Sequence, residues 1–311
     1  MECTLVFRFL LIIYLSSWAL SAQAQVHILT SIKPLQLIAA AIQEGQGEPE
    51  ALLPSGASPH YFVLRPSDAK RLNQADLFYW VGPDLENFLP RMLKRRSQPS
   101  IAVQELPQLH LQYFADSHEH THDQAHALTE HDHDHRPGTV DTHLWLLPHN
   151  ALVIAQRMSA DLSALDPKNA DHYAANLKGF TQRIKQLDQQ LKHELKPLQN
   201  QQFFVFHEAF NYFEQAYGLA HTGVFAVSSE VQPGAKHVNQ MRARLEAAGP
   251  SCVFSEPPLQ PRLAQTLASG LPVQLAELDA LGADLDVSDK GYEQLLTNLA
   301  KQFSTCLSTL K

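Results

Sequence analysis

Three histidines lie at or near the ends of predicted strands, where a parallel sheet delivers side chains to ligands. His60 stands in the segment GASPHYFVLRPSDAKRL, His143 in DTHLWLLP, and His207 directly after the strand-like run FFVF. Neutral imidazole is a borderline-soft ligand that suits zinc, and three imidazoles leave one tetrahedral position open. A single histidine is more often an ordinary surface or core residue, however, and these three are far apart in the chain. Residue type therefore allows a zinc site, but spacing alone does not define one.

A second group of histidines is concentrated in residues 116–141, which alternate histidine with acidic residues and contain almost nothing apolar. Such a composition cannot bury a core, so we expect a mobile loop. We predict that the loop binds zinc or copper weakly and collects metal for a main site. The alternative is a solvated spacer with no role in binding. The loop histidines are His118, His120, His122, His126, His131, His133 and His135.

Common catalytic patterns are missing from the sequence. No H-E-x-x-H segment is present, since His207-Glu208-Ala209 lacks the second histidine, and there is no Gly-x-Ser-x-Gly segment. A zinc hydrolase, in which a metal-bound water is the nucleophile, stays an alternative. A metal chaperone or buffer that never meets a transporter is a third possibility. We predict a binding protein and no enzyme.

The N-terminal 24 residues have the pattern of a signal peptide. An apolar run from Phe9 to Leu20 is too short to span a bilayer, which needs roughly 20 apolar residues. Ala22-Gln23-Ala24 gives the small-x-small pattern of a cleavage site, so the mature chain is expected to begin at Gln25. No cysteine follows the run to accept a lipid anchor. We therefore expect an unanchored protein of the periplasm.

Two cysteines remain after the signal segment, Cys252 and Cys306. An even pair in an oxidising compartment predicts one disulfide. Closing a loop of this size is worth about 4 kcal/mol in the chain-entropy model. A thiolate metal site is the weaker alternative, because the two residues do not have a metal-binding spacing. The net charge of −8 and the lack of a basic stripe argue against nucleic-acid binding.

Alternation of apolar runs and helical stretches predicts the α/β class, with mostly parallel sheets and flanking helices. Strands are expected at 26–30, 50–53, 76–82, 101–103, 203–206, 224–227, 252–254 and 273–275. Helices are expected at 34–43, from Ser67 onward, and at 88–93, 210–217, 236–248, 262–269 and 292–307.

One long helix is expected in the middle of the chain. Asp166 suits its N-cap and Pro167 its first residue, and Lys196-Pro197 ends it. About thirty residues at 1.5 Å each make a rod of roughly 45 Å, long enough to cross a domain. A coiled-coil dimer is the alternative, although fewer than three heptads support it. Apolar residues repeat at intervals of four and three: Tyr173, Leu177, Phe180, Ile184, Leu187 and Leu191.

The length of the mature chain exceeds a usual single core and predicts two lobes joined by this helix. The expected divisions are a signal peptide at 1–24, an N-terminal lobe at 25–165, a linking helix at 166–197 and a C-terminal lobe at 198–311.

Several segments, in one order, resemble the zinc-specific solute-binding proteins of ABC transporters. That family shows G-A-S-x-H followed by x-L-R-P-S-D, then H-L-W-L-x-P after an acidic, His-rich loop, then F-H-[DE]-A-x-x-Y-F. Here these segments are Gly56–His60 with the LRPSD that follows, His143–Pro148, and Phe206–Phe213. Three later segments also resemble the family: EVQPGA from Glu230, CVFSEP from Cys252 and LDALG from Leu278. The resemblance extends over nearly the whole mature chain.

The resemblance implies that His60, His143 and His207 bind zinc between the lobes, as the transported ion rather than a resident cofactor. A carboxylate often follows the serine of G-A-S-x-H in zinc members, but Pro59 occupies that place here. Asp279 stands where manganese-type relatives have an aspartate ligand, so it is the remaining candidate, with water or indirect support as the alternative. Glu208 is expected to support the site or the packing of the lobes.

The resemblance also implies partners and a mode of action. A membrane permease and its ATPase subunit are the expected partners of a monomeric binding protein. Members of this fold with a long helix usually move little when they bind metal, so only small shifts are expected.

Overall fold

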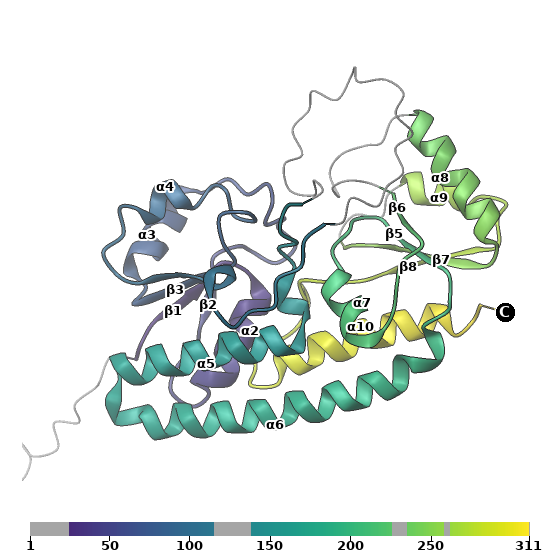
Figure 1. Cartoon of the computed structure of the whole chain (residues 1–311). Helices are drawn as coiled ribbons and strands as arrows, with labels where there is room; N and C mark the ends of the chain where they lie inside the picture. Colours follow the sequence, from purple (N-terminus) through teal and green to yellow (C-terminus); the bar gives the residue numbers. More distant parts are fainter. Residues whose placement is uncertain (1–24, 115–137, 226–234, 258–261, 311) are drawn as a thin grey trace, which may run out of the picture.

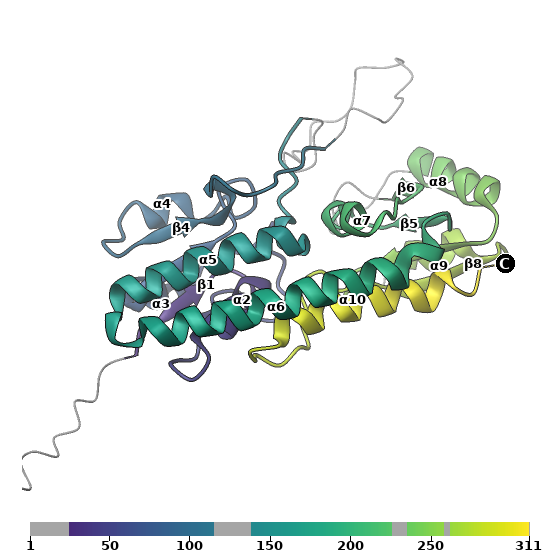
Figure 2. The same cartoon turned by 60° about the horizontal axis from the view of Figure 1, so that its bottom comes forward.

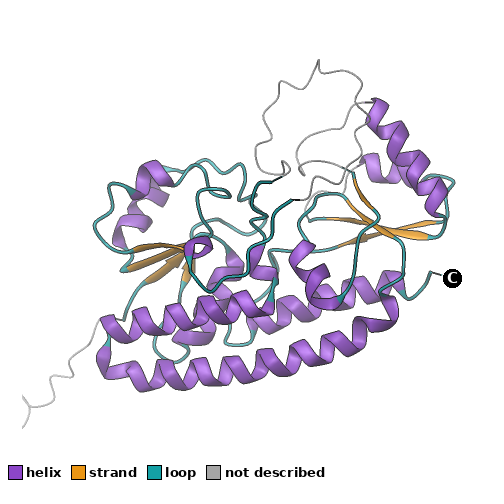
Figure 3. Cartoon of the chain, viewed as in Figure 1, coloured by secondary structure: helices purple, strands orange, loops and turns teal. Residues whose placement is uncertain are grey.

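A computed structural model describes residues 25–114, 138–225, 235–257 and 262–310. Two four-stranded parallel sheets stand side by side over a layer of long helices (Figures 1 and 3). The predicted α/β class with two strand-helix lobes is confirmed. The first sheet contains β2 (Glu50–Ala51), β1 (Ile28–Thr30), β3 (Leu77–Trp80) and β4 (Ser100–Ala102), in that spatial order. The second contains β6 (Gly223–Val224), β5 (Phe203–Val205), β7 (Ser251–Ser255) and β8 (Val273–Glu277).

The two sheets have the same topology. In each, the second strand along the chain lies on one side of the first strand, and the third strand lies on the other side. Strand order therefore reverses next to β1 in one lobe and next to β5 in the other, and ligands of open α/β sheets bind beyond such points. All eight predicted strands are present, most of them shorter by one to three residues; the end of the segment expected at 224–227 lies outside the described residues.

The sheets are flanked by helices that mostly match the predicted segments. Residues 148–165 form an α-helix whose bounds were not predicted. The helices beside the first sheet are α2 (Lys33–Gln43), α3 (Pro66–Gln74), α4 (Pro90–Leu93) and α5 (Pro148–Leu165). Those of the second lobe are α7 (Asn211–Tyr217), α8 (Ala235–Ala248) and α9 (Arg262–Ala268). Short 3-10 turns are η1 (Val103–Glu105), η2 (Leu144–Leu146), η3 (Pro167–Asn169) and η4 (Lys196–Leu198).

One long helix runs beneath both lobes, and the C-terminal helix runs beside it under the second lobe (Figures 1 and 2). The predicted long helix is α6 (Ala170–Leu195), which packs against α5. The C-terminal helix α10 (Gly291–Leu307) lies beside it. Its first residue is so close to α2 that a Cβ on Gly291 would meet Leu37. Its last turn is bonded to β7 by the disulfide between Cys306 and Cys252. The predicted disulfide is confirmed.

The start of the long helix differs from the expectation. Asp166 precedes the 3-10 turn η3, and the α-helix itself begins at Ala170. The carboxylate of Asp166 makes no cap to the backbone; it accepts hydrogen bonds from the Asn169 amide at 2.7 Å and the Tyr173 hydroxyl at 2.9 Å. The Asn169 side chain, rather than a backbone N–H, donates to the carboxylate. The residues between Asp166 and the α-helix form a 3-10 turn.

One continuous hydrophobic core extends through both lobes. It includes Leu35 and Phe78 in the first lobe, Phe180 in α6, and Phe213 and Phe303 in the second. A smaller cluster around Phe204, Phe225 and Leu245 lies on the other face of the second sheet, under α8 and α9. Because close-packed interiors resist deformation, a shared core favours lobes that move little relative to each other.

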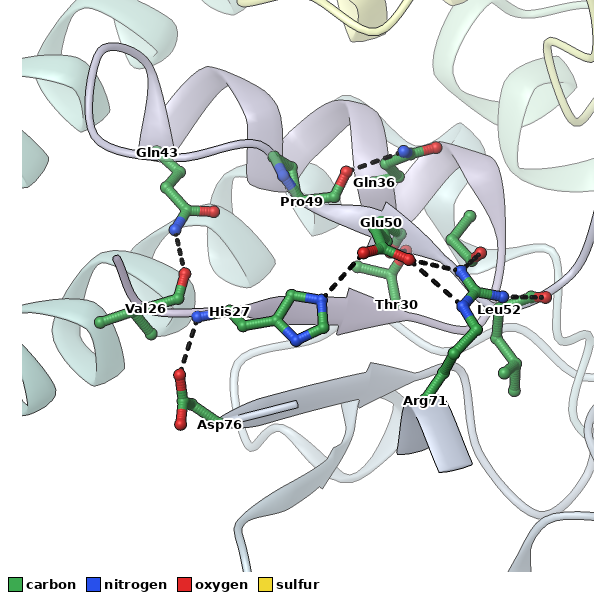
Figure 4. A network of polar contacts seen from close by, with 11 residues as sticks. Val26, His27, Thr30, Gln36, Gln43, Pro49, Glu50, Leu52, Arg71 and Asp76 are labelled. Carbon is green, nitrogen blue, oxygen red and sulfur yellow. Dashed lines mark hydrogen bonds and ion pairs between the residues drawn. The ribbon is translucent and has the colours of Figure 1, made fainter. Parts of the chain in front are cut away.

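Arg71 of α3 holds the edge strand β2 against the first sheet (Figure 4). Its guanidinium donates to the carboxylate of Glu50 at 2.8 and 3.2 Å, to the carbonyl of Ala51 at 2.7 Å and to that of Leu52 at 3.2 Å. The hydrogen bond from Arg71 is the main reason why the pKa of Glu50 is lowered. This anchor fixes the start of the segment that carries His60.

Residues of the C-terminal part return to the first lobe before α10 begins. The Ala283 carbonyl accepts hydrogen bonds from the Ser55 hydroxyl at 2.6 Å and the Lys33 ammonium at 3.3 Å. Residues that follow the boundary predicted at residue 198 therefore also contact the first lobe. Among the described residues, no helix combines the length and the apolar composition needed to cross a bilayer.

Candidate metal centre

His60 is presented by the loop between β2 and α3. Pro54 accepts a hydrogen bond from the Ala57 backbone at 3.1 Å, and this turn contains Gly56 in the left-handed region at φ 75°. The backbone N–H of His60 then donates to the Ser58 hydroxyl at 3.3 Å. The imidazole is 6% exposed, so the loop folds inward at this residue.

His143 lies at the start of the turn η2 and is 3% exposed. Its backbone N–H and its ring Nδ1 contact the same carboxylate oxygen of Asp141, at 3.0 and 2.8 Å. Asn150 of α5 donates to the Leu144 carbonyl at 3.1 Å and fixes the turn from the other side. The ring orientation of His143 is thus set by a buried carboxylate two residues earlier in the chain.

His207 follows β5, and Glu256 follows the neighbouring parallel strand β7. The carboxyl ends of adjacent parallel strands meet at one edge, so the two side chains come together although 49 residues separate them. The ring Nδ1 of His207 lies 2.8 Å from the Glu256 carboxylate, and the histidine is 3% exposed.

The three histidines converge at the cleft between the lobes. Their ring centroids are 5.7 Å apart for His60 and His143, 5.5 Å for His60 and His207, and 5.1 Å for His143 and His207. One nitrogen of each ring can be chosen such that all three lie within 4.8 Å of one another. Nitrogens bound tetrahedrally to zinc at about 2.0–2.1 Å are roughly 3.4 Å apart. The three nitrogens therefore exceed the spacing in a zinc site by at most about 1.4 Å.

The rings of His143 and His207 each have a carboxylate partner, which sets the tautomer of the ring. An ionised carboxylate only accepts hydrogen bonds, so Nδ1 of His143 and His207 carries the proton and Nε2 carries the lone pair. Burial, the largest influence, would raise the pKa of Glu256, but the charge and hydrogen bond of His207, with smaller contributions from His143 and His60, outweigh it and lower the pKa. Burial lowers the pKa of His143 despite Asp141, which keeps this ring neutral and able to bind a cation.

The roles of Asp141 and Glu256 were not predicted from the sequence. Each has a local signal: Asp141 stands two residues before a candidate ligand, and Glu256 directly follows a buried strand. Glu208, the expected supporting carboxylate, accepts a hydrogen bond from the Asn211 amide at 3.1 Å at the start of α7. The carboxylate in contact with His207 is Glu256 and not its sequence neighbour Glu208.

Asp279 is engaged with its own turn. One carboxylate oxygen accepts from the backbone N–H groups of Leu281 and Gly282 at 3.0 and 2.8 Å, and the other accepts from Ala283 at 2.7 Å. Gly282 has φ of 63°, which the turn requires. Within the described part of the chain, the converging side chains able to hold a metal are the three histidines, without Asp279. The turn contacts the centre indirectly, because the Ala280 carbonyl accepts from the Trp145 indole at 2.8 Å.

We expect Asp279→Ala to lower the free energy of unfolding by about 1–2 kcal/mol, because three backbone donors of the turn lose their acceptor. Zinc affinity should fall by less than about tenfold, since the carboxylate is held away from the ion's place. Urea unfolding and calorimetry of the same sample measure both. Asp284→Ala, an exposed change in the same segment, is the control. An affinity loss as large as that of a histidine variant, with stability unchanged, would identify Asp279 as a ligand.

The histidines of the loop, His118 to His135, lie outside the described residues. The segment's two ends are described and pair with each other. Tyr113 and Val140 form an antiparallel bridge, and the Asp141 N–H donates to the Gln112 carbonyl at 2.9 Å. The loop thus starts and ends beside the carboxylate that holds His143.

Comparison with known proteins gives close relatives over most of the chain. The protein is 38% identical over 294 residues to the high-affinity zinc uptake system protein ZnuA of Yersinia pestis, covering 91% of this chain and 92% of that protein. It is 33% identical to the ZnuA of Haemophilus ducreyi, with coverage of 96% and 98%. The ZnuA of Brucella suis is 32% identical, with coverage of 90% and 91%.

Solved structures share the fold at lower identity. A crystal structure of ZnuA superimposes with a TM-score of 0.71 at 23% identity, covering 90% of this chain and 99% of that chain. The periplasmic zinc-binding protein TroA from Treponema pallidum gives 0.72 at 19%, with coverage of 91% and 99%. FpvC from Pseudomonas aeruginosa, in complex with Mn²⁺, gives 0.74 at 19%, with coverage of 92% and 99%. The profile of the ZnuA family, described as zinc-uptake complex component A, periplasmic, matches residues 28–306, and together with these relatives it shows that the chain belongs to this family.

Proposed function

We propose that this chain is the periplasmic zinc-binding subunit of an ABC importer, and that His60, His143 and His207 hold the ion between the lobes. The observation that carries the proposal is the convergence of three buried imidazoles from three separate segments. His143 is oriented by the buried carboxylate of Asp141, and His207 by the partly exposed carboxylate of Glu256. Structural similarity does not decide the metal, because the solved relatives include a protein in complex with Mn²⁺ and one described as zinc-binding.

The donor set favours zinc. Three nitrogen ligands with one open position suit a tetrahedral ion, whereas Mn²⁺ prefers more oxygen ligands and stands low in the Irving–Williams order. Calorimetry of the mature chain should therefore show zinc bound far more tightly than manganese, with cobalt and copper also binding. Equal affinity for manganese and zinc would overturn the assignment of zinc as the cargo.

Binding releases protons from any charged imidazole and fixes the relative position of the lobes. Since one core continues through both lobes and the long helix α6 runs beneath them, the shifts are small. The loaded monomer then delivers zinc to a membrane permease that is driven by its ATPase subunit. We propose no enzymatic activity. A strain that lacks this protein should grow poorly when zinc is scarce and recover with the intact gene, but not with a gene that encodes the three alanine substitutions.

The His-rich loop is proposed as a low-affinity collector that feeds the centre. Its two ends already meet, so residues 115–137 can be replaced by a short glycine turn without moving Asp141. We expect this deletion to keep one tight zinc and to lose the weaker ones, as measured by calorimetric stoichiometry. A loop of equal length with each histidine changed to serine is the control for length. Unchanged stoichiometry in both variants would make the segment a spacer.

A further inference from the structure

The hydroxyl of Tyr212 connects the two lobes at the metal centre. Tyr212 belongs to α7 of the second lobe. Its hydroxyl accepts a hydrogen bond from the Gln112 backbone N–H at 2.9 Å and donates one to the Asp141 carbonyl at 2.8 Å. Both partners belong to the segment of the first lobe that leads to His143. One oxygen atom thus contacts both strands at the base of the His-rich segment.

The environment of this hydroxyl keeps it protonated and in place. The side chain is 0% exposed. Burial, as the largest influence, raises the pKa of Tyr212 well above its ordinary value. A protonated phenol can donate one hydrogen bond and accept another, and both directions are used here. The partly buried N–H of Gln112 and the buried carbonyl of Asp141 would each lose a partner if the hydroxyl were removed.

Tyr212 is close to a ligand on each side of the cleft. It lies five residues after His207 in a segment whose fold is fixed by β5 and α7. Asp141, whose carbonyl it holds, is the residue whose carboxylate orients His143. The helix α7 also packs against the turn η2 that follows His143. The short segment from His207 to Tyr212 and the short segment from Asp141 to His143 are therefore connected by one hydrogen bond.

Other contacts also connect the lobes, among them the hydrogen bond from the Trp145 indole to the Ala280 carbonyl and the one from the Gln112 amide to the Gln215 side chain. The helices α6 and α10 join the lobes along one side of the molecule (Figures 1 and 2). They fix the overall arrangement, but neither helix carries a candidate ligand. The contact at Tyr212 acts at the centre itself, where a shift of a fraction of an ångström changes how well three imidazoles fit one ion.

We propose that Tyr212 is a positioning residue, which sets the separation of His143 and His207 across the cleft through the backbone of Asp141. The proposal rests on the proposed function, since it assumes that the three histidines bind zinc. Partners that orient metal ligands typically change metal affinity by about 10–100-fold when they are removed. Tyr212 acts one step further from the ion, so a loss near the lower end is expected.

The test compares Tyr212→Phe with Tyr217→Phe. Tyr217 lies on the same helix, is 2% exposed, and its buried hydroxyl has no hydrogen-bond partner within the described residues. Both changes remove one buried oxygen and leave the ring. We expect Tyr212→Phe to weaken zinc binding about tenfold, and to change the visible absorption bands of bound Co²⁺, which report distortion of the coordination geometry. Tyr217→Phe should change neither.

A double-variant cycle shows whether the effect passes through Asp141. In an Asp141→Ala background the side chain that orients His143 is already absent, so adding Tyr212→Phe should cost much less than it does in the wild type. Wild-type affinity and an unchanged Co²⁺ spectrum in Tyr212→Phe would overturn the proposal, and so would equal losses in the two phenylalanine variants. If the wild type itself binds no zinc at His143, the proposed function fails, and that result is separate from any effect of Tyr212.

Discussion

Changing His60, His143 or His207 to alanine, one at a time, is expected to abolish the tight zinc-binding event while the fold is kept. Each imidazole supplies one of the three ligands that converge within the described part of the chain, so its loss leaves two of them and admits water. The expected fall in affinity exceeds about 100-fold, the upper range for partners that merely orient a ligand. Calorimetry of variants that lack the His-rich segment measures this without interference from weaker sites.

His172→Ala is the matched control, because this histidine is exposed on α6 and is not part of the converging group. It should bind zinc as the wild type does. Circular dichroism and thermal unfolding must show that the three site variants are folded. Tight zinc binding that survives in the triple alanine variant would refute the assignment of all three residues.

The same site predicts the direction of the pH dependence. Metal binding requires neutral imidazole, so zinc affinity should fall as the pH drops below about 6.5, where ordinary histidines gain a proton. Burial lowers the pKa of His143, so this ring loses its binding capacity only at a lower pH than an exposed histidine. The decline should therefore be shallower than that of a site made of three exposed imidazoles.

Changing Glu256 or Asp141 to alanine is expected to weaken zinc binding by about 10–100-fold. Three neutral imidazoles carry no charge, and these two carboxylates contact the rings of His143 and His207 and help to offset the charge of the ion. They also hold the protons on Nδ1 and direct the Nε2 lone pairs to the centre. Glu256→Gln and Asp141→Asn can still accept the hydrogen bond, so their losses should be smaller and should report mainly the missing charge.

Glu208→Gln is the control for the Glu256 and Asp141 variants. Glu208 is adjacent to His207 in sequence, but its carboxylate contacts Asn211 at the start of α7. We expect near wild-type affinity from this variant in the same calorimetric titration. A larger loss from Glu208→Gln than from Glu256→Gln would show that the charge near His207 is supplied by the sequence neighbour, contrary to the observed hydrogen bond.

The features that depend on local sequence pattern could be predicted from the amino-acid sequence alone. Alternating apolar runs located eight strands, because burying a parallel strand requires such a run wherever the strand lies in the fold. In the same way, the disulfide was predicted from the cysteine pair, and the long helix from the periodicity of the repeat from Tyr173 to Leu191. The three histidines came from matched motifs, and their meeting at one point could not be derived from spacing.

Which distant residues become neighbours follows from the tertiary structure and could not be predicted from the sequence. Glu256 contacts His207 because β5 and β7 are neighbours in the sheet, and strand order is a property of the whole lobe. The helix α10 runs beneath the second lobe and reaches the first, because its first turn packs on α2 and its last is bonded to β7. Asp279 accepts hydrogen bonds from its own turn, and the hydroxyl of Tyr212 reaches the backbone of Asp141. The contacts of Glu256 with His207 and of Tyr212 with Asp141 join residues that are 49 and 71 positions apart. They depend on how packed elements are placed, which the residue types do not encode one by one.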